Sequence, residues 1–287
     1  MIKNRILLYL SAATLFFNAC EKIVELDIPS EEDRLVVEAQ ITNVKDLWKV
    51  KLSTSQKYFN QNSYSNIKEA AVTITEGNGT ITQLTHQDSG WFFSADSMEC
   101  AIGETYTLRV IYNGKEHIAA EQLANGFPID IIETYYLPDG NGFIQEGYYV
   151  FIKGLENDYK GDSYLWRVYK NDTFQEGFGN LIENDEFGDV SYLNKQIDPI
   201  NPTKDIDKGI VPRPFPFILE VGDEIRIEQF NLSPMYYQYL IDLSAQQSRS
   251  GSPFDPPPAN PTNNISNGGL GYFSVAHMVK ASVKVKE

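Results

Sequence analysis

The chain has 287 residues, with 24 Lys and Arg against 39 Asp and Glu, and a formal net charge of −15 at pH 7. A chain this acidic is a poor partner for nucleic acid or for anionic lipid surfaces. It contains two cysteines, which excludes an intramolecular disulfide framework as the source of stability, so a hydrophobic core has to supply it.

The first twenty residues have the layout of an export signal. A basic start is followed by an apolar run over residues 6–17, and Ala19 directly precedes Cys20. The run is shorter than the roughly 20 apolar residues that span a bilayer, so we interpret residues 1–19 as a signal peptide. A cysteine after a small residue resembles the bacterial lipobox, whose thiol receives lipid. Plain secretion and a retained anchor helix are the alternatives.

Cys20 is therefore the predicted lipidation site, and residues 20–33 are the predicted lipidated tether. Cleavage before Cys20 leaves 22 basic against 39 acidic side chains, a charge of −17. Each buried methylene contributes about 0.8 kcal/mol, so two or three acyl chains hold a protein at a membrane durably. We expect a protein anchored by lipid to the outer membrane, at the cell surface or on the periplasmic face.

Residues 34–124 contain short segments rich in β-branched and aromatic residues, separated by Gly, Asn, Asp and Ser. This pattern predicts strands, at 34–42, 48–58, 70–77, 79–87, 90–95 and 105–122. Within the last segment, Asn113-Gly114 has the residue types of a two-residue hairpin turn. So many short strands in one stretch predict an N-terminal β-sandwich of immunoglobulin or fibronectin type.

A Gly and a Pro at residues 126–128 interrupt the pattern and predict a domain boundary at 124/125. Strands are expected again at 129–137, 147–156, 163–172, 215–233 and 271–285. One helix is expected at about 234–249, because Ser233 can cap it and Pro234 suits its first position. Its apolar stripe predicts packing against the core. The second domain, 125–287, is thus predicted to be β-rich with one helix and long loops.

Two loops are candidates for contact with a partner. The insertion 173–214 has little periodicity, and the proline-rich segment 252–270 favours either an extended strap across a sheet edge or part of a binding surface. Exposed aromatic side chains often anchor interfaces. The candidate partner surface consists of Phe174, Phe178, Phe187 and Phe254. Packing of these rings into the core is the alternative.

No motif in the sequence indicates catalysis. Zinc-hydrolase, serine-elbow and phosphate-loop patterns are missing from it, so we expect a non-catalytic protein without a cofactor. An extracellular hydrolase without a recognisable motif is the alternative. Acidic residues at Asp139 and around Asp185 could supply oxygen ligands for calcium, although turn formation also explains Asp139. Cys100 is expected to be buried at a strand end, and the three tryptophans are expected to be buried in strands.

Five segments together resemble a known family. They are Cys20-Glu21-Lys22, "LDIP" (26–29), "LVVEAQITN" (35–43), "VKLSTSQKYF" (50–59) and "PFDPPPANPTNNISNGGLGYFSV" (253–275). The combination resembles an uncharacterised family of Bacteroidetes lipoproteins, known as a domain of unknown function. Genes of that family typically lie beside genes for TonB-dependent outer-membrane receptors.

The resemblance implies a non-catalytic binding or accessory subunit of a TonB-dependent receptor in nutrient uptake. It implies no particular ligand, and Cys20 is the one site residue that it carries over. A surface-assembly or fimbrial-type structural lipoprotein is the alternative, because such proteins also combine a lipobox with tandem β-sandwiches.

Overall fold

Strands dominate the part of the chain that the computed structural model describes, residues 33–55, 65–137, 146–153, 163–175, 181–184, 218–247 and 259–287. The first half contains β1 (Leu35–Thr42), β2 (Asp46–Thr54), β3 (Ala71–Glu76), β4 (Ile81–Asp88), β5 (Trp91–Met98), β6 (Thr105–Tyr112) and β7 (Lys115–Gln122). The second contains β8 (Ile131–Leu137), β9 (Gly147–Lys153), β10 (Ser163–Lys170), β11 (Thr173–Phe174), β12 (Leu181–Asn184), β13 (Glu224–Leu232), α3 (Pro234–Gln247) and β14 (Leu270–Lys284). The predicted mostly β fold class, with a helix in the second half, is confirmed.

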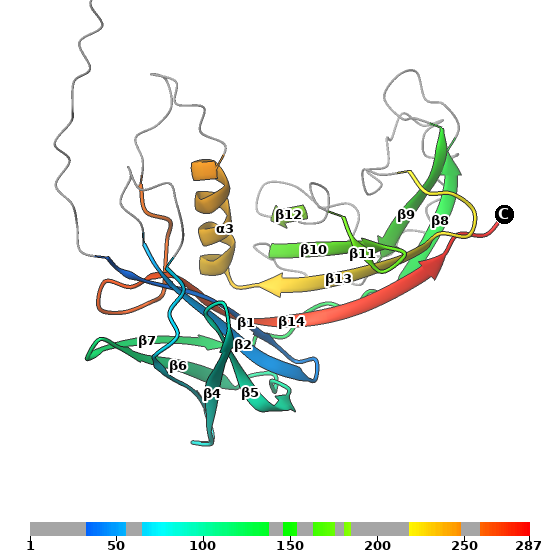
Figure 1. Ribbon diagram of the computed structural model, residues 1–287. Coiled ribbons are helices and arrows are strands. Elements are labelled where there is room, and N and C mark those ends of the chain that lie inside the picture. The colour runs from blue at the N-terminus through cyan, green and yellow to red at the C-terminus, as the bar shows by residue number, and fades with distance from the viewer. Residues whose placement is uncertain are drawn as a thin grey trace, which may run out of the picture. The chain divides into compact units, whose positions relative to one another are not determined.

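Twelve of these strands form one hydrogen-bonded sheet (Figure 1). Its order is β11-β10-β13-β14-β1-β2-β5-β4-β3-β6-β7, and β12 pairs with β10 beside β11. β8 and β9 form a separate two-stranded sheet. The last strand, β14, runs parallel to β1 on one side and antiparallel to β13 on the other. This central strand therefore joins the two halves of the sheet.

The core of the first half follows from the period-two alternation of its strands. In β1 the side chains of Val37, Ala39 and Ile41 are buried, and buried residues of β2, β3, β5, β6 and β14 meet them. The β7 edge returns to the segment before β14, where Ile118 N donates to Ser266 Oγ at 2.7 Å and Ser266 N donates to Ile118 O at 2.9 Å. The sheet thus folds back around this core, as in a sandwich.

The predicted hairpin between β6 and β7 is confirmed. Asn113 and Gly114 have φ angles of 48° and 72°, the left-handed values that a two-residue turn of type I′ needs. The register starts with Tyr112 opposite Lys115 and continues to Thr105 opposite Gln122.

In the second half, the sheet of β10, β13 and β14 has two different faces. One face is covered by the β8–β9 hairpin, and the buried residues between them include Val150, Ile152, Trp166, Ile225 and Ile227. The opposite face carries a smaller apolar group, and α3 lies over it (Figure 1). This second face contains the candidate site.

Two expectations for this half are corrected. The insertion 173–214 has little periodicity in its sequence and is expected to be a long loop, but Thr173–Phe174 and Leu181–Asn184 form β11 and β12. Both pair with β10, whose backbone groups on that edge would otherwise have no strand partner. The strand predicted over 215–233 is interrupted by a turn at Gly222, whose φ is 98°, so β13 begins at Glu224.

The described part of the proline-rich segment, residues 259–269, contains no strand or helix. Asn264 uses its side-chain amide to bond both Phe273 backbone groups, accepting from N at 3.0 Å and donating to O at 2.8 Å. β13 does not extend along β14 as far as Phe273, so Asn264 closes an edge that lacks a strand partner there. This contact is of the kind that a strap across a sheet edge makes.

The domain boundary predicted at 124/125 lies in residues 123–130, which form no regular element. Asp33–Glu287 group together as one compact unit, because β14 pairs with strands from both halves. The division into domains 34–124 and 125–287 stays a prediction, and the predicted signal peptide 1–19 lies outside the described residues.

Candidate functional site

A groove of about 550 Å³ lies on the face of the sheet below α3. Its floor comes from β1, β10, β13 and β14, one end comes from β2 and Trp91, and α3 supplies a wall. The same alternation that builds the core creates this floor. In β1, Val37, Ala39 and Ile41 face the core, so the residues between them, Glu38 and Gln40, lie on the groove face.

Helix α3 is positioned by polar contacts near its start and its middle. Ser233 caps the helix, accepting a hydrogen bond from Tyr236 N at 3.2 Å, and it donates to the Glu121 carboxylate on β7. Further along, Asp242 Oδ2 accepts from Thr262 N at 2.8 Å and from Thr262 Oγ1 at 2.7 Å. These bonds lower the pKa of Asp242, the backbone bond most strongly.

The expectation that α3 packs against the core is confirmed in part. None of its side chains is fully buried. Tyr236, Tyr237 and Leu240 pack partly against the apolar group on the sheet, and Leu243 lines the groove. The same side of the helix therefore both contacts the sheet, through Tyr236 and Leu240, and lines the groove. The sequence pattern identified the face of the helix that contacts the sheet, but not the groove along that face.

Three tyrosines, two from α3 and one from β14, form an aromatic wall. The ring centroids of Tyr236 and Tyr239 lie 4.9 Å and 5.4 Å from that of Tyr272 on β14, and 5.9 Å from each other. Burial raises the pKa of all three hydroxyls, to about 12 for Tyr272. They are therefore protonated near neutral pH and can donate hydrogen bonds.

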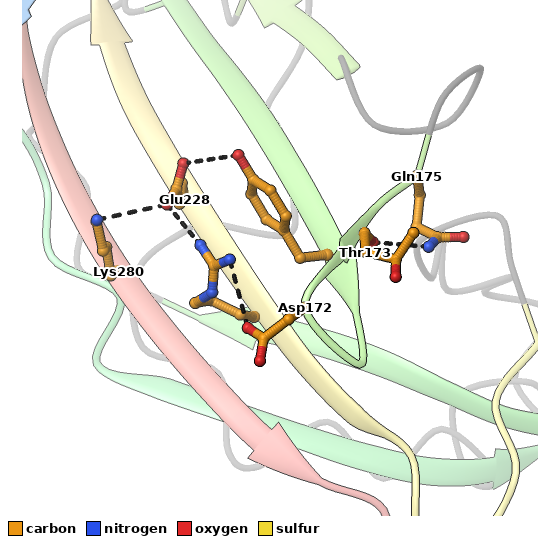
Figure 2. A network of polar contacts seen from close by, with 7 residues as sticks. Asp172, Thr173, Gln175, Glu228 and Lys280 are labelled. Atoms are coloured by element: carbon orange, nitrogen blue, oxygen red, sulfur yellow. Dashed lines mark hydrogen bonds and ion pairs between the residues drawn. The ribbon is translucent and has the colours of Figure 1, made fainter.

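A connected network of charged side chains reaches the groove through Tyr169, Glu228 and Lys280 (Figure 2). Glu228 on β13 accepts from Arg226 at 2.6 Å, from Lys280 at 3.4 Å and from the Tyr169 hydroxyl at 3.3 Å. The Arg226 guanidinium lies 3.9 Å from the centre of the Tyr169 ring and 3.6 Å from Asp172. One buried carboxylate thus orders two cations and a tyrosine, which makes this part of the floor rigid before any ligand binds.

Arg167 on β10 has a different environment. Its guanidinium lies 4.6 Å from the centre of the Phe230 ring and donates one hydrogen bond to Gln40 Oε1 at 3.2 Å. No carboxylate of the described chain forms an ion pair with it. The Gln40 Nε2 atom beside it is buried and has no hydrogen-bond partner.

The tryptophan expectation is confirmed for two of three residues. Trp48 and Trp166 are buried, at 2% and 4% exposure. Trp91 is half-buried and lies at the end of the groove, with the ammonium groups of Lys49 and Lys51 at 5.9 Å and 5.8 Å from its ring. Its strand position alternates with the core residue Phe92, which explains the difference.

Of the predicted partner surface, the structure describes Phe174. This ring is half-buried on β11 and lies 5.5 Å from the ring of Tyr169, which lines the groove. The remaining predicted positions lie outside the described residues: Cys20, Phe178, Phe187, Phe254, Asp139 and Asp185. In the described part of the chain, no cluster of three or more His, Cys, Asp or Glu is arranged to hold a metal ion.

Cys100 is buried as expected, just after the end of β5, with 4% exposure and no disulfide partner. Burial raises the pKa of its thiol to about 12. We therefore expect Cys100 in the Cys20→Ala chain to resist Ellman's reagent at pH 8, because the thiolate is the reactive form. The same chain in denaturant should release one equivalent of product at once. Rapid reaction of the folded chain would contradict this burial.

Sequence reasoning missed the main groove residues, Gln40, Arg167, Glu228 and Tyr272. Each belongs to a strand that was predicted, and its alternation with core residues placed it on the outer face. These residues come together because β10, β13, β14 and β1 are neighbours in the sheet, and the sequence does not reveal that strand order.

These features define a mostly β protein with a groove between a curled sheet and one helix. The chain belongs to the family described as Domain of unknown function (DUF4249), which it matches over residues 21–282. The resemblance expected from the sequence is confirmed at this level. No curated protein matches the chain. None of the described helices is long and apolar enough to cross a membrane.

Proposed function

We propose that the protein is an outer-membrane lipoprotein, anchored through Cys20, that acts as a non-catalytic binding subunit beside a TonB-dependent receptor. The observation that carries the binding role is the groove. Its volume of about 550 Å³ is within the range of small-molecule sites, roughly 300–1,000 Å³. It combines an aromatic wall with a few fixed charged groups, the composition that such sites share.

Membrane attachment would make weak binding sufficient. A lipid anchor confines the protein to the plane of the membrane, which raises its effective concentration at a neighbouring receptor without any new contact. The receptor as partner comes from the family resemblance in the sequence. The groove supports the simpler part of the proposal, namely that this chain holds a ligand near that receptor.

The test is a pull-down of the C-terminally tagged protein from gently solubilised outer membranes, with mass spectrometry of what co-purifies. We expect one TonB-dependent barrel in near-stoichiometric yield, and we expect it to disappear with Cys20→Ala, which removes the anchor. Recovery of the protein alone would contradict the accessory role. Recovery of further copies of the same chain would favour a surface-assembly lipoprotein instead.

A further inference from the structure

We propose that the groove recognises an organic anion, whose carboxylate binds the Arg167 guanidinium and whose flat apolar body lies against the tyrosine wall. This inference rests on the groove being the binding surface of the proposed function, and it adds the chemical class of the ligand.

The first observation is the unused capacity of Arg167. A guanidinium has five N–H donors, and this one makes a single hydrogen bond, to Gln40 Oε1. Two nearby cations are paired: Arg226 and Lys280 share Glu228. Since a half-buried cation gains most from a carboxylate that accepts two parallel bonds, Arg167 is the position at which an external anion would be held.

The second observation is Gln40. Arg167 carries donors only, so the side-chain amide of Gln40 must present its oxygen to the guanidinium, and its Nε2 is left buried without an acceptor. A buried donor without a partner is costly. A carboxylate bound at Arg167 would lie beside this amide and could accept a hydrogen bond from it. One ligand group would thus satisfy both unpaired sets of donors.

The third observation concerns the rest of the ligand. Tyr236, Tyr239 and Tyr272 give the groove an aromatic lining, and Leu243 and Met278 add apolar side chains to it. The chain as a whole carries −15, so its long-range field repels multiply charged anions. Both facts favour a monocarboxylate with an aromatic or similarly flat body over a phosphate or a polyanion.

The experiment compares two probes of the same shape, 2-naphthoate and the neutral 2-naphthamide, by isothermal titration with the full chain carrying Cys20→Ala. We expect 2-naphthoate to bind about tenfold more tightly, the ratio that one charge-assisted interaction supports. Arg167→Gln should abolish this ratio. Arg109→Gln, which removes an exposed arginine paired with Glu116 on the β6–β7 hairpin, is the matched control and should preserve it.

A second variant keeps the inference testable if Arg167→Gln folds poorly. Gln40→Glu places a carboxylate beside Arg167 inside the protein itself, so it should abolish the preference for 2-naphthoate while leaving the thermal midpoint unchanged or higher. Loss of binding without loss of stability would support the anion site.

Equal affinity for the two probes would overturn the inference and leave the groove as a site for a neutral ligand. A preference for 2-naphthoate that survives both Arg167→Gln and Gln40→Glu would overturn it as well, because the anion would then bind elsewhere. Binding of neither probe would also overturn it. In each case the pull-down decides the accessory role separately.

Discussion

Replacing Gly271 with alanine is expected to destabilise the protein by roughly 4 kcal/mol, the sum of backbone strain and overpacking. Gly271 lies near the start of β14 with a φ of 90°, a left-handed value that L-residues rarely adopt. It pairs with Val37 on β1, and a Cβ atom at this position would overlap the Val37 carbonyl. Either β14 moves away from β1 or the ladder between them breaks. Because β14 joins both halves of the sheet, the damage would not stay local.

Gly268→Ala is the control for this prediction. Gly268 also has a left-handed φ, 72°, but a Cβ atom there would meet nothing within 4 Å. It therefore isolates the cost of the backbone conformation, about 1 kcal/mol. Urea unfolding of the Cys20→Ala chain and of the two glycine variants in that background measures both effects. Equal losses in the two variants would show that the approach of β14 to β1 is looser than described.

Replacing Glu121 with glutamine is expected to remove a fall in stability between about pH 4.5 and 7. Glu121 lies on β7, and its carboxylate accepts hydrogen bonds from Val275 N at 2.7 Å, from Tyr272 Oη at 3.4 Å and from Ser233 Oγ. Burial nevertheless dominates and raises the pKa of this carboxyl to about 7. The folded protein therefore retains a proton that the unfolded chain has lost.

The sign of the effect follows from proton linkage. Between the unfolded pKa near 4.5 and the folded pKa of about 7, the folded state binds more protons, so stability falls as pH rises. The stabilisation is fully present below about pH 4.5 and is lost above about pH 7, a total of about 3 kcal/mol. Glutamine cannot titrate, so the difference in unfolding free energy between the two proteins should change by this amount.

Chemical denaturation at a series of pH values tests this difference, in which the titration of the other acidic residues cancels. Glu116→Gln, on the same strand but 44% exposed and paired with Arg109, is the matched control and should retain the fall in stability between about pH 4.5 and 7. If Glu121→Gln follows the parent protein in parallel through this pH range, Glu121 is ionised in the folded state and its burial is overstated.

Gly271 and Glu121 show why certain features are visible in the sequence and others are not. The run "GGLGYFS" (268–274) stood out as a family signature, but its reason is geometric: Gly268 makes a turn, and Gly271 lets β14 approach the backbone of β1. Glu121 has no distinguishing sequence context. It is important because β13 stops short of Val275, so that a side chain from β7 bonds the free N–H group there.

Local patterns were sufficient to predict most strands, the Asn113-Gly114 hairpin, helix α3 and the burial of Cys100. Each of these features depends on near neighbours in the chain, through alternation, turn conformation, capping or side-chain polarity.

The candidate site depends on contacts between distant segments. Gln40 and Arg167 meet because the last strand of the chain inserts between β1 and β13, and α3 stands over that face because Glu121 and Thr262 hold it there. The alternation in each strand determined which side chains leave the core. Only the pairing of β14 with both halves decided which of them share a groove, since strand order depends on long-range packing that no local pattern encodes.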